Sequence, residues 1–235
     1  MAIITLDSNS RGNDSAFQTS LTWAHTCSGE NRVLYVLTSI ESDTAPHSDQ
    51  TVSSVTYNGV ALTKITSVYV TGDNGVEIWQ LIAPSTGANN IVVTYTGEVD
   101  GSFGAGISFN GVDQTVPTNV SGTNQTTPAG ANVATSVTTS AIGCVLLNIA
   151  HATGSTVTLT KDASDTQLYN EATTSDFTTG VAYRITTTQG SFTSTWTTSP
   201  NDQMVIAMVA ISPATTGYLK GRRRQRIDLS GVSAG

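Results

Sequence analysis

The chain has 235 residues, of which 11% are charged, and its formal net charge at pH 7 is −7. This length can bury a substantial core as one large domain or as two small ones. Residues 1–11 lack the basic and apolar segments of a secretory signal, and no apolar run reaches the roughly 18 residues that a membrane-spanning helix needs, so we expect neither.

The residue composition predicts an all-β protein. Threonine occurs 40 times, often beside valine or isoleucine, and these β-branched residues fit the pleated surface of a sheet. Helix-forming residues are scarce, and no segment shows the apolar period of an amphipathic helix over more than a turn or two. Glycine, asparagine, aspartate and proline interrupt the chain about every 8–15 residues, which is typical of a sandwich or barrel.

Seven strands are predicted in the first half of the chain, at residues 16–25, 33–40, 52–57, 60–69, 75–82, 90–96 and 103–110. Asn58-Gly59 lies between two of them and can adopt positive φ at both positions, which predicts a hairpin turn. The sequence TGDNG at 71–75 predicts a second turn.

The pattern of predicted strands in the second half parallels that in the first. Residues 111–131 lack an apolar pattern and predict a linker or long loop. After it, residues 143–154, 180–186, 191–197 and 204–211 parallel residues 31–40, 75–81, 90–96 and 104–111. We predict an antiparallel, jelly-roll-like β-sandwich at 1–219 with weak internal duplication, pseudo-halves at about 1–112 and 130–214, and an extended C-terminal arm at 220–235.

Three predicted strands, at 33–37, 144–150 and 204–211, are apolar on both faces. A strand with one solvated face alternates apolar and polar residues instead. Either loops of the same chain or another subunit must therefore cover the second face. The second alternative predicts an oligomer or a larger assembly.

No catalytic motif is visible, and we expect neither an enzyme nor a cofactor. His25, His47 and His151 lie in separate segments without a paired ligand, so a structural or surface role is expected for each. Acidic residues occur singly in turns, and no metal site is predicted, although a loop calcium site remains an alternative. Cys27 and Cys144 are expected to be buried and reduced.

The tryptophans bear on carbohydrate binding. Trp23, Trp79 and Trp196 could stack on sugar rings if they were exposed. Trp79 and Trp196 lie in strands with a core pattern, so we expect them to face inward.

The C-terminal arm holds half of the positive charge of the chain. Residues 1–219 contain 5 basic and 16 acidic residues, a net charge of −11, whereas residues 220–235 contain 5 basic residues and 1 acidic residue, a net charge of +4. The basic residues of the arm are Lys220, Arg222, Arg223, Arg224 and Arg226. An acidic body repels phosphate, and no aromatic residues lie among the basic ones, which argues against direct nucleic-acid binding.

A solvated tail and a docking segment are the two remaining interpretations of the arm. Arginine binds carboxylates through paired hydrogen bonds, and the acidic bodies of other copies supply such groups. After the basic residues, Ile227 and Leu229 alternate with polar residues, so RIDLSGV could add a strand to the sheet edge of a neighbour. We predict that the arm is an assembly element.

Three segments, VSSVTYNGVALTKI, GVEIWQLIAPSTGANNIVVTYTG and GISFNGVDQTVP, together resemble a β-sandwich module of structural proteins of tailed bacteriophages. Related modules occur in bacterial surface proteins. The resemblance covers about residues 30–120 and consists of turns and strands, so it transfers no functional residues. It implies a virion component, such as a capsid decoration or fibre protein.

We therefore expect a non-enzymatic virion structural protein that is assembled in the host cytoplasm. The expected partners are other copies of the chain and the major capsid or tail protein, and no membrane is involved. The alternative function is a carbohydrate- or receptor-binding module of the adhesin or tail-fibre type, with a glycan as ligand. A hydrolase with a site built from distant loops is a third interpretation.

Overall fold

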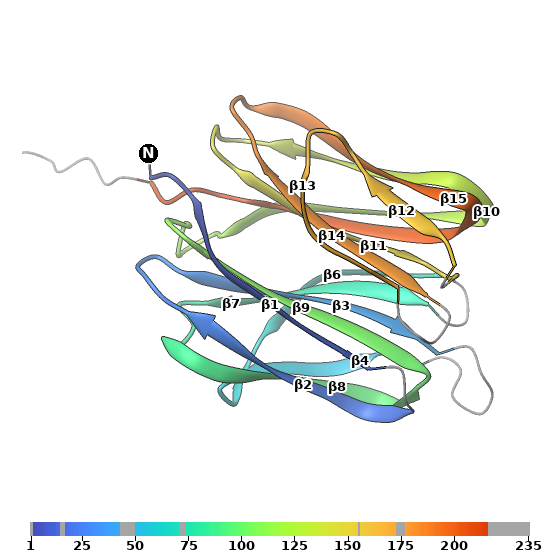
Figure 1. The fold of residues 1–235 in the computed structure, drawn as a ribbon. Coiled ribbons are helices and arrows are strands. Elements are labelled where there is room, and N and C mark those ends of the chain that lie inside the picture. The colour runs from blue at the N-terminus through green and yellow to red at the C-terminus, as the bar shows by residue number, and fades with distance from the viewer. Residues whose placement is uncertain are drawn as a thin grey trace, which may run out of the picture.

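The computed structural model describes residues 2–14, 17–42, 50–70, 74–154, 156–172 and 177–215. The described residues form β-strands, turns and connecting segments, and none of them lies in a helix (Figure 1). All the strand pairs are antiparallel. The all-β, sandwich-like class that the composition predicts is confirmed.

All seven strands predicted in the first half are present. The first half contains β1 (Thr5–Asp14), β2 (Gln18–Cys27), β3 (Val33–Glu41), β4 (Val52–Tyr57), β5 (Val60–Ala61), β6 (Thr63–Tyr69), β7 (Gly75–Ile82), β8 (Gly87–Val99) and β9 (Gly101–Asn110). Asn58 and Gly59 have φ angles of 51° and 75°, which confirms the predicted turn. The predicted turn at 71–75 lies largely outside the described residues.

The second half contains six strands, two of which, β10 and β15, are much longer than the segments that the sequence predicts. They are β10 (Thr118–Thr139), β11 (Val145–Ala152), β12 (Thr158–Lys161), β13 (Thr166–Ala172), β14 (Thr178–Ile185) and β15 (Gly190–Ile211). The predicted loop at 111–131 is wrong from Thr118 onward, because these residues begin β10. The first part of β10 pairs with β15 alone and many of its side chains are exposed, so it needs no apolar pattern.

Each half has the strand order of a jelly roll. In the first half the sheets are β1-β9-β3-β7-β6 and β2-β8-β4-β5. β1 thus pairs with β9, β2 with β8 and β3 with β7. These are the nested strand pairs of a jelly roll.

The second half repeats this order with two bent strands. Residues 118–126 of β10 and 204–211 of β15 lie in one sheet, in the order β10-β15-β11-β14-β13. Residues 132–139 of β10 and 190–197 of β15 continue past the bend and pair again, and β12 pairs with β15 there. The internal duplication is therefore visible in the strand order of the two halves.

The sheets stack in four layers, with the two larger sheets facing each other at the centre (Figure 1). The central core joins both halves and includes Tyr35 and Leu37 of β3 and Leu147 of β11. On the opposite face of β3, Leu34 and Val36 pack against the sheet that contains β2 and β8.

This layering explains the strands that are apolar on both faces. β3, β11 and the end of β15 belong to the two inner layers, and other sheets of the same chain cover both of their faces. Neither of the predicted covers, a set of loops or another subunit, is needed. The prediction of an oligomer therefore loses this support.

Candidate functional site at the start of the C-terminal arm

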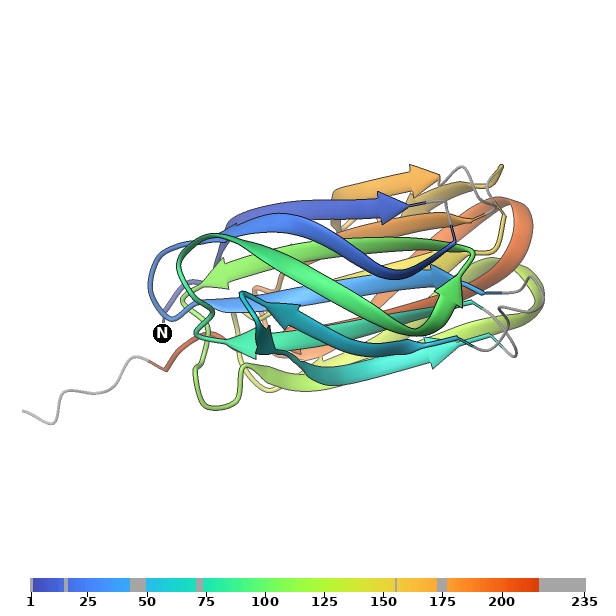
Figure 2. The same cartoon turned by 90° about the horizontal axis from the view of Figure 1, so that it is seen from below.

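The residues that the sequence predicts as the assembly site lie outside the described residues. They are Lys220, Arg222, Arg223, Arg224, Arg226, Ile227 and Leu229. The structure instead describes the place where the arm begins. The last described residues lie beside the N-terminus at one end of the molecule (Figures 1 and 2).

Backbone hydrogen bonds hold the chain at this point. The N–H group of Ala2 donates to the carbonyl oxygen of Ala214 at 3.1 Å, and the N–H group of Ala214 donates to that of Gly111 at 2.8 Å. Val112 and Pro213 form an isolated antiparallel bridge. The chain up to Ala214 is therefore held between the N-terminus and the connection that joins the two halves.

An apolar depression of about 340 Å³ lies beside this position. We call it the isoleucine cleft, because Ile3, Ile142 and Ile185 line it together with Ala2 and Gly143. The three isoleucines have exposed fractions of 80%, 49% and 48%. Contiguous exposed apolar side chains of this kind mark interaction sites on soluble proteins.

Local backbone contacts hold the cleft in place. Ile142 lies in the turn between β10 and β11, and Ile185 is the last residue of β14. The N–H group of Gly143 donates to the carbonyl oxygen of Thr186 at 2.9 Å, and the N–H group of Thr186 donates to the carbonyl oxygen of Cys144 at 2.8 Å. The turn is thus fixed against the end of β14.

A smaller polar hollow of about 210 Å³ lies beside Ala214 and Thr215 and is also lined by Asp113 and Gln114, among others. The Oδ1 atom of Asp113 accepts hydrogen bonds from the N–H groups of Thr115 at 2.8 Å and Val116 at 3.0 Å. These two bonds lower the pKa of the Asp113 carboxyl group below its usual value. An ionised carboxylate therefore lies close to the start of a basic arm.

A groove of about 650 Å³ lies between the two halves. Ile82 and Val116 line it and are 40% and 58% exposed. At its base, Gln80 Nε2 donates to the hydroxyl oxygens of Tyr35 at 2.7 Å and Thr118 at 2.9 Å. The described lining contains no charged side chain, so the groove is amphipathic and neutral.

A chain of hydrogen bonds around His25 has residue types found in catalytic sites. Ser10 Oγ lies 2.8 Å from His25 Nδ1 and accepts from Trp23 Nε1 at 3.1 Å. Ser108 Oγ lies 3.1 Å from His25 Nε2 and donates to Asp7 Oδ2 at 2.8 Å. The indole can only donate and the carboxylate can only accept, so the direction is fixed: Ser10 donates to Nδ1, and Nε2–H donates to Ser108.

The surroundings of His25 favour a structural role for this chain. His25 is 1% exposed, and burial lowers its pKa to about 4, with the Asp7 carboxylate opposing part of the effect. A general base works best with a pKa near the working pH and needs access to a substrate. The hydrogen bonds instead join β1, β2 and β9 across two layers.

His151 bridges the two halves. Thr179 Oγ1 on β14 donates to Ser39 Oγ on β3 at 2.9 Å, and Ser39 in turn lies 2.7 Å from His151 Nδ1 on β11. The ring of His151 stacks on Phe177 at 4.9 Å between centroids. His151 is fully buried, which lowers its pKa to about 3. The remaining histidine, His47, lies outside the described residues.

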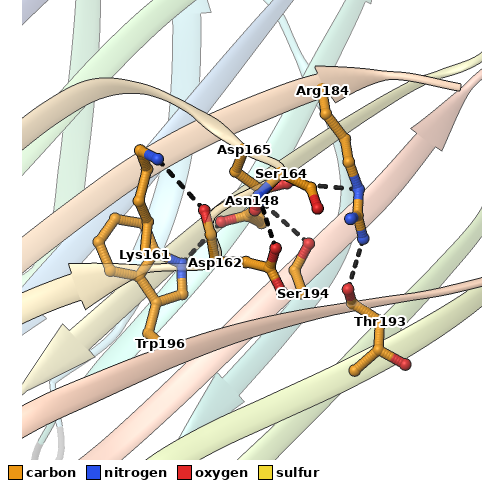
Figure 3. A network of polar contacts seen from close by, with 9 residues as sticks. All are labelled: Asn148, Lys161, Asp162, Ser164, Asp165, Arg184, Thr193, Ser194 and Trp196. Carbon is orange, nitrogen blue, oxygen red and sulfur yellow. Dashed lines mark hydrogen bonds and ion pairs between the residues drawn. The ribbon is translucent and has the colours of Figure 1, made fainter.

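A buried polar network in the second half is shown in Figure 3. Trp196 Nε1 donates to Asn148 Oδ1 at 2.8 Å, and Asn148 Nδ2 donates to Asp165 Oδ2 at 3.0 Å. Arg184 Nε lies 3.3 Å from Asp165 Oδ1. Burial raises the pKa of Asp165, and the Arg184 guanidinium opposes this change. The network is enclosed between layers and connects β11, β14 and β15.

All three tryptophans belong to the core, with exposed fractions of 8% for Trp23, 6% for Trp79 and 0% for Trp196. The inward orientation predicted for Trp79 and Trp196 is confirmed. Among the described residues the large aromatic side chain with high exposure is Phe17, at 58%. A sugar-stacking platform made of the tryptophans is therefore not formed.

Cys27 and Cys144 are buried and unpaired, as predicted, and burial raises the pKa of both thiols. In the part of the chain that the structure describes, no three His, Cys, Asp or Glu side chains are grouped to hold a metal ion. No helix with the length and hydropathy of a membrane span occurs among these residues either.

Sequence reasoning identified the arm but missed the isoleucine cleft. Ile3, Ile142 and Ile185 are far apart in the sequence: Ile3 precedes β1, Ile142 lies in a turn, and Ile185 ends β14. Isoleucine in a turn is a weak signal, and only the packing of the second half against the N-terminus brings the three together.

Comparisons with known proteins found no match to a family model, to a curated protein or to a solved structure.

Proposed function

We propose that this chain is a non-enzymatic structural protein of a tailed-phage virion, a capsid decoration or another surface protein, and that it assembles through its C-terminal arm. The observation that carries the proposal is the position of the chain that leads to the arm. Ala214 and Thr215, the last described residues, lie at one end of the molecule, between an exposed apolar cleft and the Asp113 carboxylate. The fold supports this proposal, since jelly rolls recur in viral capsid proteins.

The electrostatics of the chain favour contact between the arm and another body. The arm has a net charge of +4 and residues 1–219 have a net charge of −11, so arm-to-body contacts are attractive and arm-to-arm contacts are repulsive. A single exposed ion pair contributes only about 0–1 kcal/mol. On a particle with many copies of the chain, the small contributions of these ion pairs would add up. The proposed partners of the arm are therefore other copies of the chain and the major capsid or tail protein.

Deletion of residues 220–235 tests this function. All described strands end by Ile211, so the truncated protein should keep its circular dichroism spectrum and melting temperature. Its copy number per purified particle should fall at least severalfold, and high salt should weaken attachment of the full chain in the same direction. A variant with Arg222, Arg223 and Arg224 changed to Lys is the control that keeps the charge. Normal incorporation of the truncated protein would contradict the proposal.

A carbohydrate- or receptor-binding module is the second candidate, and the groove between the halves is the observation that favours it. The groove has a volume of about 650 Å³, and both polar and apolar side chains line it. A glycan array with the full chain and with Val116→Asp, a change at the exposed rim, separates the two functions. Selective binding that the substitution abolishes would favour the second candidate.

A further inference from the structure

We propose that the isoleucine cleft binds Ile227 and Leu229 of the arm of the same chain. The basic residues between Thr215 and Ile227 are then displayed as a closed loop at one end of the molecule. This inference rests on the proposed function, because it specifies how the arm is presented to a neighbouring acidic surface.

The first argument is the state of the cleft. Three isoleucines with exposed fractions of 48–80% surround one depression beside the end of the described chain. Ile4, the residue that follows Ile3, is 1% exposed and forms the inner wall. An apolar segment placed here would remove all three exposed side chains from water at once.

The second argument is reach. Ala2 lines the cleft, and its N–H group is bonded to the carbonyl oxygen of Ala214, so the chain passes along the edge of the cleft immediately before the arm. Residues 216–226 separate Thr215 from Ile227, and an extended chain spans roughly 3.3 Å per residue. The segment can therefore extend up to about 36 Å, and Ala2 brings the wall of the cleft next to Ala214, where the segment leaves the described chain. A tether of this length keeps the apolar residues at an effective concentration of about millimolar.

The third argument is the pattern of the arm. Ile227 and Leu229 are two residues apart, so their side chains lie on the same face of an extended segment, while Asp228 and Ser230 lie on the other face. Two apolar side chains suit a small cleft whose walls are isoleucine, alanine and glycine with one threonine, Thr187. The groove between the halves fits less well, because Gln80 and Thr118 form its base and are bonded to each other.

Docking would change what the basic residues can do. With Thr215 and Ile227 both held at the same end, Lys220 and the four arginines lie in a loop with fixed ends. A closed loop loses less conformational entropy when it binds carboxylates than a free tail does. The partner that this loop fits is an acidic protein surface, such as the body of another copy.

Hydrogen exchange on the full chain tests the docking. The probes are the amides of Gly143 and Thr186, whose hydrogen bonds hold the turn at the cleft. In the double variant Ile227→Asp, Leu229→Asp these amides should exchange about tenfold faster than in the unchanged chain. Ile142→Asp should have the same effect from the side of the cleft. Ser230→Asp, on the other face of the arm, and Val60→Asp, an exposed residue of β5, are matched controls and should change neither amide.

Each other outcome overturns the inference. Equal exchange in the unchanged chain and the double variant would show that the cleft is empty. Loss of protection at residues 118–121 instead would place the arm in the groove between the halves. Protection that disappears on hundredfold dilution, with a dimer seen by sedimentation, would assign the arm to a second copy. Hydrogen exchange uses the isolated protein, whereas the deletion experiment measures incorporation into particles. The docking inference can therefore fail while the proposed function holds, and the proposed function can fail while the docking inference holds.

Discussion

Asn148 connects more groups than any neighbouring side chain in the buried network of the second half. It is fully buried, accepts a hydrogen bond from Trp196 and donates to Asp165, which in turn lies beside Arg184. A buried donor that loses its partner cannot regain one from water, so the penalty of an unpaired group exceeds the net gain from forming the bond. One amide thus keeps an indole and a carboxylate satisfied inside the sandwich.

We predict that Asn148→Leu lowers the free energy of unfolding by about 2–4 kcal/mol, because it leaves the Trp196 N–H group unpaired and removes a donor from Asp165. Urea unfolding followed by tryptophan fluorescence measures the change. Asn119→Leu is the matched control, since Asn119 is exposed and its bond to Ser140 Oγ at 2.8 Å is replaceable by water. The control should change stability by less than about 0.5 kcal/mol. Equal effects of the two substitutions would contradict this role of Asn148.

At the scale of strands, glycines set the distance between facing sheets. A Cβ atom at Gly104 of β9 would lie 2.4 Å from the ring of Trp23 on β2. In the second half, a Cβ atom at Gly180 of β14 would lie 2.3 Å from the ring of Trp196 on β15. In both halves an indole therefore lies directly on the backbone of the sheet that faces it, and only glycine permits this contact.

We expect Gly180→Ala to destabilise the protein by about 1–3 kcal/mol or more, because the added methyl group must displace Trp196 or separate the layers. Gly130→Ala provides the control: its Cβ atom would meet Thr126 at 3.6 Å, an ordinary contact distance. Thermal unfolding of the two variants gives the comparison. A melting temperature of Gly180→Ala equal to that of Gly130→Ala would show that the layers can adjust freely.

The strands also show which features of the sequence carry information about the fold. β3 and β7 were predicted within one residue because they are buried on both faces and read as apolar runs. β1 was not predicted, since its residues TLDSNSRGND are mostly polar and it lies at the edge of its sheet, paired with β9 alone. Edge strands bury little surface, and their pairing depends on a partner far away in the sequence.

The candidate site divides in the same way. The basic residues of the arm are contiguous, so composition alone identifies them. The isoleucine cleft combines Ile3, Ile142 and Ile185, and the tertiary structure alone brings these together. The same holds for His25 and His151, whose partners Ser10 and Ser39 lie on other strands.

For the whole molecule, the decisive contact is the one between the two jelly rolls. Their larger sheets share a single apolar core, which includes Val33 and Phe109 of the first half and Val145 and Val209 of the second. His151 lies at this boundary and is bonded to Ser39 of the other half. A neutral imidazole is tolerated there, but a charged one would be buried without a counter-charge.

Acid should therefore destabilise the protein and loosen the contact between its halves. The pKa of His151 is about 3 in the folded protein and close to 6.5 when the chain is unfolded. Its contribution to stability is complete above pH 6.5 and is lost as the pH falls from 6.5 toward 3, because the unfolded chain then binds a proton that the folded protein does not. The full contribution is on the order of 5 kcal/mol. His25, with a pKa of about 4, adds a similar dependence within the first half.

His151→Gln separates this effect from other titrations. Glutamine keeps a neutral polar group near Ser39 and cannot take up a proton, so the variant should lose less stability than the unchanged chain between pH 7 and pH 4. Urea unfolding midpoints across this range give the two slopes, and carboxylates, which titrate alike in both proteins, cancel in the difference. His25→Gln should also flatten the dependence of stability on pH. Because His25 lies within the first half, this variant should leave the exchange of the Thr179 amide, at the boundary between the halves, unchanged. Identical slopes for His151→Gln and the unchanged chain would mean that His151 can be protonated without opening the boundary between the halves.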